Sequence, residues 1–284
     1  MREVEVLGDH VLLTLEDRDW YVHSVFEHTF NLTDKQHTPL VILTGDRSKL
    51  LPGGLYLPPR DFNDLLSQIR DTRKVAFRGD SFYIETYQDL WRLRIVDSFR
   101  ADLLTEGIRS DRLGYLLNNC RNIDRQTGFD QPFQDFLTAE TSPYQKETSW
   151  LTNAVTVQWG VDFFIGRGRG LTPSGDDFLL GWLLIDWLSG NHQELRAAVA
   201  SRIGDASYTT DVGRSYLYYA LRRRFSSALL GIVRYLKGNE PLENLDNLLA
   251  EAIEYGNTSG IDCLAGIVSA LVYKQVNLDL DLKY

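Results

Sequence analysis

Residues 166–182 read GRGRGLTPSGDDFLLGW and combine spaced glycines with two arginines and two adjacent aspartates. Glycines ahead of a helix leave backbone N–H groups free for an anion, and the positive end of the helix dipole favours negative charge there. Arginine adds charge and bidentate hydrogen bonds to an oxyanion. The anion-binding residues predicted in this stretch are Arg167, Gly168, Arg169, Gly170, Thr172, Ser174 and Gly175.

The pattern S-G-x-D-x-L-x-G occurs twice, at 174–181 and at 259–266. Each copy leads into an apolar run with helical spacing, so each should begin a helix. A capping box would explain the serine and the acid of either copy alone. It does not explain the glycine between them, the upstream glycines or the additional acid at Asp176. We therefore expect two paired helices whose N-termini meet in one pocket.

Three aspartates of the two copies, Asp176, Asp177 and Asp262, are the predicted catalytic residues. Carboxylates could orient a nucleophile, take a proton or hold Mg²⁺. Four more residues complete the predicted anion-binding set: Thr209, Thr210, Ser259 and Gly260. For the two threonines, which open a further expected helix, a helix cap is the competing interpretation.

The glycines of this stretch do not form a nucleotide fingerprint. They follow an expected helix instead of a strand, and they lack the Gly-Lys-Ser/Thr ending of a phosphate-binding loop. Neither ATP nor NAD is expected, and no cofactor is required, although Mg²⁺ remains possible.

Two parts of the chain should position this site. In residues 1–98, β-branched and aromatic residues cluster between turn signals, which predicts a β-rich domain of barrel or sandwich type. Within it, Arg78–Ser81 should form a hairpin turn, and 51–59, LPGGLYLPP, should be a connection at the edge of the sheet.

Residues 99–284 carry apolar residues at helical spacing, beginning with the stretch 99–120, and predict an all-α domain that contains both S-G-x-D copies. Glycines stand where helices should end, at Gly128, Gly190, Gly238 and Gly256. The predicted fold class is therefore α+β, with a β-rich domain followed by a larger helical one.

Composition excludes several classes of protein. A net charge of −9 and a pI near 5.1 argue against a nucleic-acid partner, which usually requires a basic face. Two cysteines, Cys120 and Cys263, are too few for a disulfide framework or a four-cysteine zinc site. The most apolar run, 178–188, is too short to span a bilayer, and the N-terminus has no signal-like segment. We expect no membrane contact and a cytoplasmic location.

The first motif, G-x-G-x-G-L-T-P-S-G-D-D-F-L-x-G at 166–181, resembles the signature of a bacterial family associated with the AllH-type subunit of oxamate carbamoyltransferase. Thr209-Thr210 and the 256–262 segment are similar to further landmarks of that family, so the resemblance covers about residues 160–270. At Arg167 and Arg169 the chain departs from the small or apolar residues typical of the family. This departure leaves a different carboxylate substrate possible.

The resemblance implies a multi-subunit enzyme of allantoin-derived purine catabolism. Such an enzyme transfers a carbamoyl group between oxalurate and phosphate, with oxamate and carbamoyl phosphate as products. The implied partners are companion carbamoyltransferase subunits and a small anionic substrate. Two alternatives stand beside it: a non-catalytic subunit that binds a small anion or acts as a scaffold, and a different Mg²⁺-dependent enzyme of small molecules.

Overall fold

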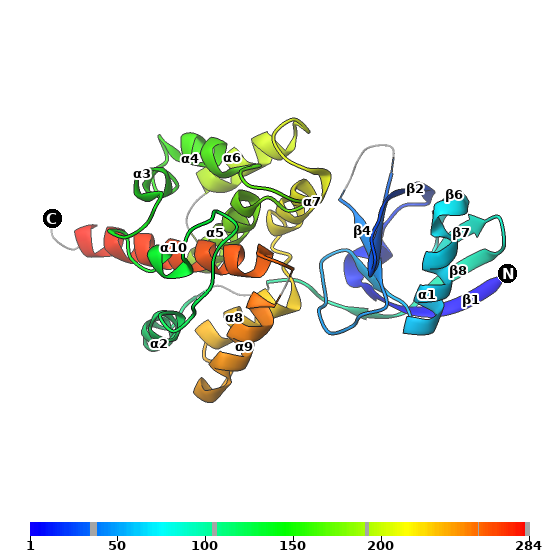
Figure 1. Cartoon of the computed structure of the whole chain (residues 1–284), viewed down its shortest axis with the longest axis horizontal. Coiled ribbons are helices and arrows are strands. Elements are labelled where there is room, and N and C mark those ends of the chain that lie inside the picture. Colours follow the sequence, from blue (N-terminus) through cyan, green and yellow to red (C-terminus); the bar gives the residue numbers. More distant parts are fainter. Residues whose placement is uncertain (35–38, 104–106, 191–192, 255, 282–284) are drawn as a thin grey trace. The chain divides into compact units, whose positions relative to one another are not determined.

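The computed structural model describes residues 1–34, 39–103, 107–190, 193–254 and 256–281, with side chains up to Lys274. The chain divides into two compact units. The first comprises Met1–Asp102 and Arg224–Ser227, and the second comprises Leu103–Arg223 and Ala228–Tyr284. The mixed β-rich and helical fold predicted from the sequence is confirmed (Figure 1).

The first unit is a closed barrel with the strand order β1-β5-β4-β3-β2-β6-β7-β8. Neighbouring strands are antiparallel except for two pairs, β1 with β8 and β4 with β5, which are parallel. The strands are β1 Arg2–Asp9, β2 Arg18–Val25, β3 Thr29–Thr33, β4 Val41–Thr44, β5 Gly54–Tyr56, β6 Thr72–Arg78, β7 Ser81–Thr86 and β8 Leu90–Phe99. Short 3-10 helices cover His10–Thr14 and Ile69–Asp71.

Large aromatic and aliphatic side chains that point inward fill the barrel, among them Trp20, Phe77 and Trp91, which are fully buried. In β7 and β8 buried residues alternate with more exposed ones, as a barrel wall with one dry face requires. Helix α1, Pro59–Gln68, lies beside the barrel strands (Figure 1), and its Phe62 and Leu65 belong to the same core. The sequence interpretation did not include this helix.

Two sequence predictions about the barrel have different outcomes. The Arg78–Ser81 hairpin turn is confirmed, since these two residues pair at the ends of β6 and β7. The expectation for 51–59 is wrong in part, because this segment contains β5, which pairs on both sides and is a barrel strand. A closed barrel has no free edge at which such a connection could lie.

A four-residue segment returns to the first unit late in the chain. Arg224 forms ion pairs with Asp9 and Asp102, and the Phe225 N–H donates to the Ala101 carbonyl at 2.9 Å. Burial raises the pKa of Asp9, which the Arg224 charge partly offsets. The domain division predicted from the sequence, at residue 98, did not include this late segment in the first domain.

The second unit is helical, and α5 and α10 are its longest helices (Figure 1). Its helices are α2 Ser110–Cys120, α3 Gln145–Trp150, α4 Val157–Phe164, α5 Ser174–Ser189, α6 Gln193–Ile203, α7 Asp211–Ala220, α8 Ser227–Leu236, α9 Leu245–Ile253 and α10 Ser259–Asp281, with 3-10 helices at Phe133–Phe136 and Leu242–Asn244. Helix α5 is buried on almost every side, as expected for a helix that is apolar all round.

Most of the predicted helix ends are confirmed. Gly190, Gly238 and Gly256 have positive φ just after α5, α8 and α9. Gly128 does not end a helix; it belongs to a tight turn after α2. The helical pattern read from residue 99 becomes a helix only at Ser110, because β8 extends to Phe99.

Candidate functional site

Helices α5 and α10 pack with their backbones in direct contact. A Cβ atom added at Gly181 of α5 would lie 2.2 Å from the Cys263 carbonyl oxygen of α10. A Cβ added at Gly266 of α10 would lie 2.1 Å from the Phe178 carbonyl oxygen of α5. The last glycine of each motif therefore contacts the backbone of the residue three positions before the last glycine of the other motif. These reciprocal contacts give α5 and α10 a local two-fold relationship.

The second glycines of the two motifs are equally confined. A Cβ at Gly175 would lie 1.8 Å from the Phe164 carbonyl oxygen at the end of α4, and one at Gly260 would lie 2.0 Å from the Ala252 carbonyl oxygen near the end of α9. Each S-G step thus packs against the helix that precedes it. The two-fold relationship extends to both helix–loop–helix units, and it explains why glycine follows serine in each copy.

The same relationship exchanges acids and hydroxyls between the two motifs. The Asp177 carboxyl of the first copy has the Ser259 hydroxyl of the second copy beside it. The Asp262 carboxyl of the second copy has the Ser174 hydroxyl of the first copy beside it. The competing explanation, a capping box, does not apply to the first copy, because α5 follows Pro173 and no side-chain cap bond is made. We call Asp177 and Asp262 the carboxyl pair.

Asp262 is fully buried, and its Oδ1 accepts a hydrogen bond of 2.8 Å from the Gly128 N–H. Burial raises the pKa of Asp262 to about 6, against the Gly128 bond and the nearby Ser174 and Thr258 hydroxyls, which lower it. Oδ2 has no hydrogen-bond partner among the described residues.

Asp177 is 4% exposed, and burial raises its pKa well above the ordinary value of 3.8. The hydroxyls of Ser259 and Thr172 oppose this shift, and the charges of Asp262 and Asp176 add to it. Those two hydroxyls bond each other at 2.7 Å. The Cys263 thiol lies 3.9 Å from Asp177 Oδ1, whereas Oδ2 has no partner in the part of the chain that the structure describes.

Asp176 has a different environment from the carboxyl pair. Its Oδ1 accepts 2.7 Å from the Gly166 N–H, and its Oδ2 accepts from the Thr209 hydroxyl. Burial raises its pKa to about 6 in spite of these bonds. Because both oxygens accept hydrogen bonds, Asp176 connects α5 to the glycine loop and to the segment before α7.

Thr210 is the N-cap of α7: its hydroxyl accepts from the Gly213 N–H at 2.9 Å and donates to the Leu171 carbonyl. The cap interpretation of this residue is therefore confirmed. Thr209 and Thr210 both hold the glycine loop in place, and their hydroxyls are engaged within the protein.

The glycine loop, residues 166–172, is ordered by its own backbone. Gly166, Gly168 and Gly170 have φ of 69°, 111° and 95°, a region that favours glycine. The loop is closed by a bond of 2.8 Å from the Gly175 N–H to the Arg167 carbonyl. This bond uses an N–H of the α5 N-terminus that the sequence interpretation assigned to an anion.

The predicted ligand-facing residues of the loop differ in what they contact. The Arg167 guanidinium donates to the Phe163 carbonyl at 2.8 Å and lies over the Phe163 ring. Arg169 is exposed and forms no ion pair with a described residue. The N–H groups of Gly168 and Gly170 likewise make no hydrogen bond within the described chain. A Cβ at Gly168 would lie 3.0 Å from the Ser174 Oγ, so the loop backbone lies next to Ser174, whose hydroxyl is beside Asp262.

Sequence reasoning missed three residues around the carboxyl pair: Gly128, Thr258 and Cys263. A Cβ at Gly128 would lie 2.1 Å from Ser174 Oγ and 2.7 Å from Asp262 Oδ2, so only glycine fits over the pair. Next to it, Phe129 packs against Phe164 and Phe178 and anchors the turn. Thr258 could have been found, because a threonine lies one or two residues before the serine in each copy. Nothing in the sequence pattern indicated Gly128.

The three aspartates do not assemble into a metal centre. Within the described ranges, no group of three or more His, Cys, Asp or Glu side chains is arranged to hold a metal ion. Asp176 is saturated by a backbone N–H and a hydroxyl, both of which are donors. The donor set therefore does not fit Mg²⁺, and no catalytic step is assigned to one.

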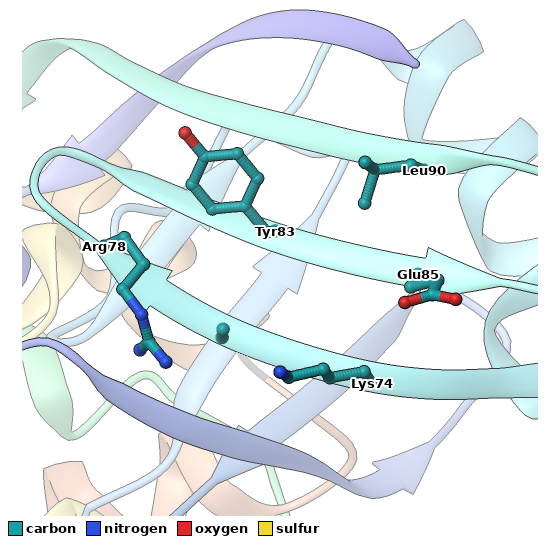
Figure 2. Close-up of a pocket in the computed structure, with 6 residues that line it drawn as sticks. Lys74, Arg78, Tyr83, Glu85 and Leu90 are labelled. Carbon is teal, nitrogen blue, oxygen red and sulfur yellow. The ribbon is translucent and has the colours of Figure 1, made fainter.

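The barrel has a hollow of its own on its outer face. It has a volume of about 310 Å³ and is lined by Lys74, Ala76, Arg78, Tyr83, Glu85 and Leu90 (Figure 2). Ala76, paired with Tyr83 across β6 and β7, leaves the space that a larger side chain would fill. Arg78 is paired with Asp19 at 2.9 Å. The hollow carries no catalytic combination of residues.

Comparison with known proteins supports the resemblance seen in the sequence. Residues 164–271 match the family model described as oxamate carbamoyltransferase subunit AllH, and residues 4–99 match the AllH family N-terminal domain. No solved structure matches the chain. Of the helices described, none has the length and apolar character needed to cross a bilayer. Since the two matches together cover most of the chain, this protein belongs to the AllH family, whose name is that of an oxamate carbamoyltransferase subunit.

Proposed function

We propose that this chain is a working subunit of a carbamoyltransferase in allantoin-derived purine catabolism, and that α5 and α10 build its substrate site. The observation that carries the proposal is the reciprocal placement of the two S-G-x-D copies, which buries Asp177 and Asp262 beside each other's serines. A helix cap needs neither burial of the acid nor a partner motif. Perturbed carboxyl pKa values at such a junction are typical of functional sites.

The glycine loop supplies the anion-binding part of this proposal. The exposed N–H groups of Gly168 and Gly170 and the guanidinium of Arg169 can face a carboxylate or a phosphate. In carbamoyl transfer the attacked carbonyl becomes a tetrahedral oxyanion, which fixed N–H donors stabilise more than the ground state. The loop is held by Asp176, Thr209 and Thr210, so its donors are preorganised.

The carboxyl pair supplies the proton chemistry. In the direction from carbamoyl phosphate, the oxamate nitrogen attacks the carbamoyl carbon, the C–O bond to phosphate breaks, and the nitrogen gives up a proton. Asp262, with a pKa of about 6, is mostly ionised near neutral pH and can take that proton. No covalent enzyme intermediate is required. Companion subunits complete the enzyme in this proposal.

The test is turnover of the purified chain, combined with its companion subunits, with oxalurate and phosphate as substrates and carbamoyl phosphate as the measured product. Asp262→Asn should lower kcat by roughly 100-fold or more, the usual contribution of a general base. Asp246→Asn, an exposed first-turn acid of α9, is the matched control and should be unchanged. Full activity of Asp262→Asn would favour the scaffolding alternative, and loss of wild-type activity on chelation would favour the Mg²⁺-dependent one.

A further inference from the structure

Each member of the carboxyl pair has one oxygen without a well-formed hydrogen bond to a described residue, although serine and threonine hydroxyls lie near both carboxyls. Oδ2 of Asp177 and Oδ2 of Asp262 are buried and have no partner among the described residues. Buried carboxyl oxygens without donors are rare, because each forfeits the hydrogen bonds that water would supply. Such a pair of oxygens at a candidate site indicates that the missing donors belong to a ligand.

An anion cannot supply what these oxygens lack. Part of the first turn of each helix is already occupied: the Asp176 N–H donates to the Pro173 carbonyl at 2.8 Å, and the Asp262 N–H donates to the Thr258 carbonyl at 2.9 Å. No described arginine, lysine or histidine forms an ion pair with either member of the pair. A carboxylate or phosphate placed there would add negative charge to two buried carboxyls.

We infer that the carboxyl pair recognises the N–H groups of a primary carboxamide or carbamoyl group, and that the site thereby selects an amide over an equally sized carboxylate. The inference deepens the proposed function and rests on it for the choice of ligand. An amide nitrogen brings two N–H donors, which matches the two unpartnered oxygens. An amide-bearing anion would then place its –NH₂ at the carboxyl pair and its carboxylate at the glycine loop.

The layer between the pair and solvent is thin. Thr172, Thr258 and Gly128, which surround the two carboxyls, are themselves partly exposed. Gly128 covers the pair with its backbone alone. The loop and the pair are linked through Ser174, which contacts Gly168 on one side and neighbours Asp262 on the other.

Oxamate and oxalate distinguish recognition of the amide from recognition of the anion, because oxamate carries –NH₂ where oxalate carries –O⁻. Calorimetric titration of the full chain should give a dissociation constant for oxamate at least tenfold lower than for oxalate. Asp262→Asn replaces an acceptor with a donor and should reduce or reverse this ratio. Asp246→Asn, at an exposed first-turn acid of α9, is the matched control and should leave the ratio unchanged.

Oxalate binding as tightly as oxamate to the wild-type chain would overturn the inference, and so would an unchanged ratio in Asp262→Asn. Binding of neither compound, with or without companion subunits, would also overturn it. The wild-type ratio does not depend on any variant folding. If oxamate binds better than oxalate but no carbamoyl transfer occurs, the proposed reaction is wrong while the amide selection stands. If transfer occurs without selection, only the amide selection is wrong.

Discussion

Replacing Asp262 with asparagine should make the protein more stable at neutral pH. Folding raises the pKa of this carboxyl from the ordinary 3.8 to about 6, so the folded state disfavours its ionised form. The difference corresponds to about 3 kcal/mol, at roughly 1.4 kcal/mol for each unit of pKa. Asparagine keeps an oxygen for the Gly128 N–H, carries no charge, and can donate toward the hydroxyls near Oδ2.

The size of this effect changes with pH in a defined window. Below about pH 3.8 the carboxyl is neutral in both states, so it imposes no penalty. The penalty grows as pH rises and is complete above about pH 6. The stability advantage of Asp262→Asn should therefore be largest at pH 7.5, up to about 3 kcal/mol, and should shrink toward pH 4.5.

Urea unfolding followed by far-UV circular dichroism measures this advantage, since the signal comes mainly from the helical unit. Asp246→Asn is the matched control: it removes an exposed first-turn carboxylate and should cost about 0.3–1 kcal/mol through the helix dipole. If Asp262→Asn is instead less stable than the wild type at pH 7.5, by an amount that pH does not change, the reasoning on burial is refuted.

Three further predictions concern packing and ion pairing. Gly266→Ala should destabilise the protein by about 1–3 kcal/mol or more in urea unfolding, because its Cβ would lie 2.1 Å from a carbonyl oxygen of α5. The control Gly114→Ala, at a position with open space around it, should raise the free energy of unfolding by about 0.5–1 kcal/mol. Thr210→Ala should lower the free energy of unfolding by about 1 kcal/mol, and an unchanged value would refute its role as the α7 cap. Arg224→Met should destabilise the barrel by about 3–5 kcal/mol at pH 7, seen in the fluorescence of its tryptophans, and by less at low pH, where Asp9 becomes neutral.

Much of the fold could be predicted because periodicity is a local property of the sequence. The hairpin at 78–81 and most helices follow from alternation, helical spacing and glycine stops. Strand β5 could not be predicted in the same way: it has three residues in a Pro/Gly-rich segment, and only its pairing with β1 and β4 makes it a strand. Tertiary context, not propensity, decides short strands of this kind.

The candidate site could be predicted only to the level of which segments meet. The repeat at 174 and 259 indicated two paired helix starts, and the structure brings them together. It could not indicate that the hydroxyl of each copy faces the acid of the other, since that depends on how α5 and α10 cross. The placement of Gly128 over Asp262 depends on a turn 134 residues away and leaves no local signal.

The two-fold relationship is broken at the carboxyl pair. Asp177 and Asp262 occupy equivalent positions in the repeat, yet among the described residues a backbone N–H, that of Gly128, bonds Asp262 alone, while Asp177 faces a thiol. This N–H lowers the pKa of Asp262 against the effect of burial. Under the proposed function, the same bond would favour the ionised form of Asp262 that accepts a proton. Duplicated motifs alone would give two identical acids, and the single glycine turn gives them different surroundings.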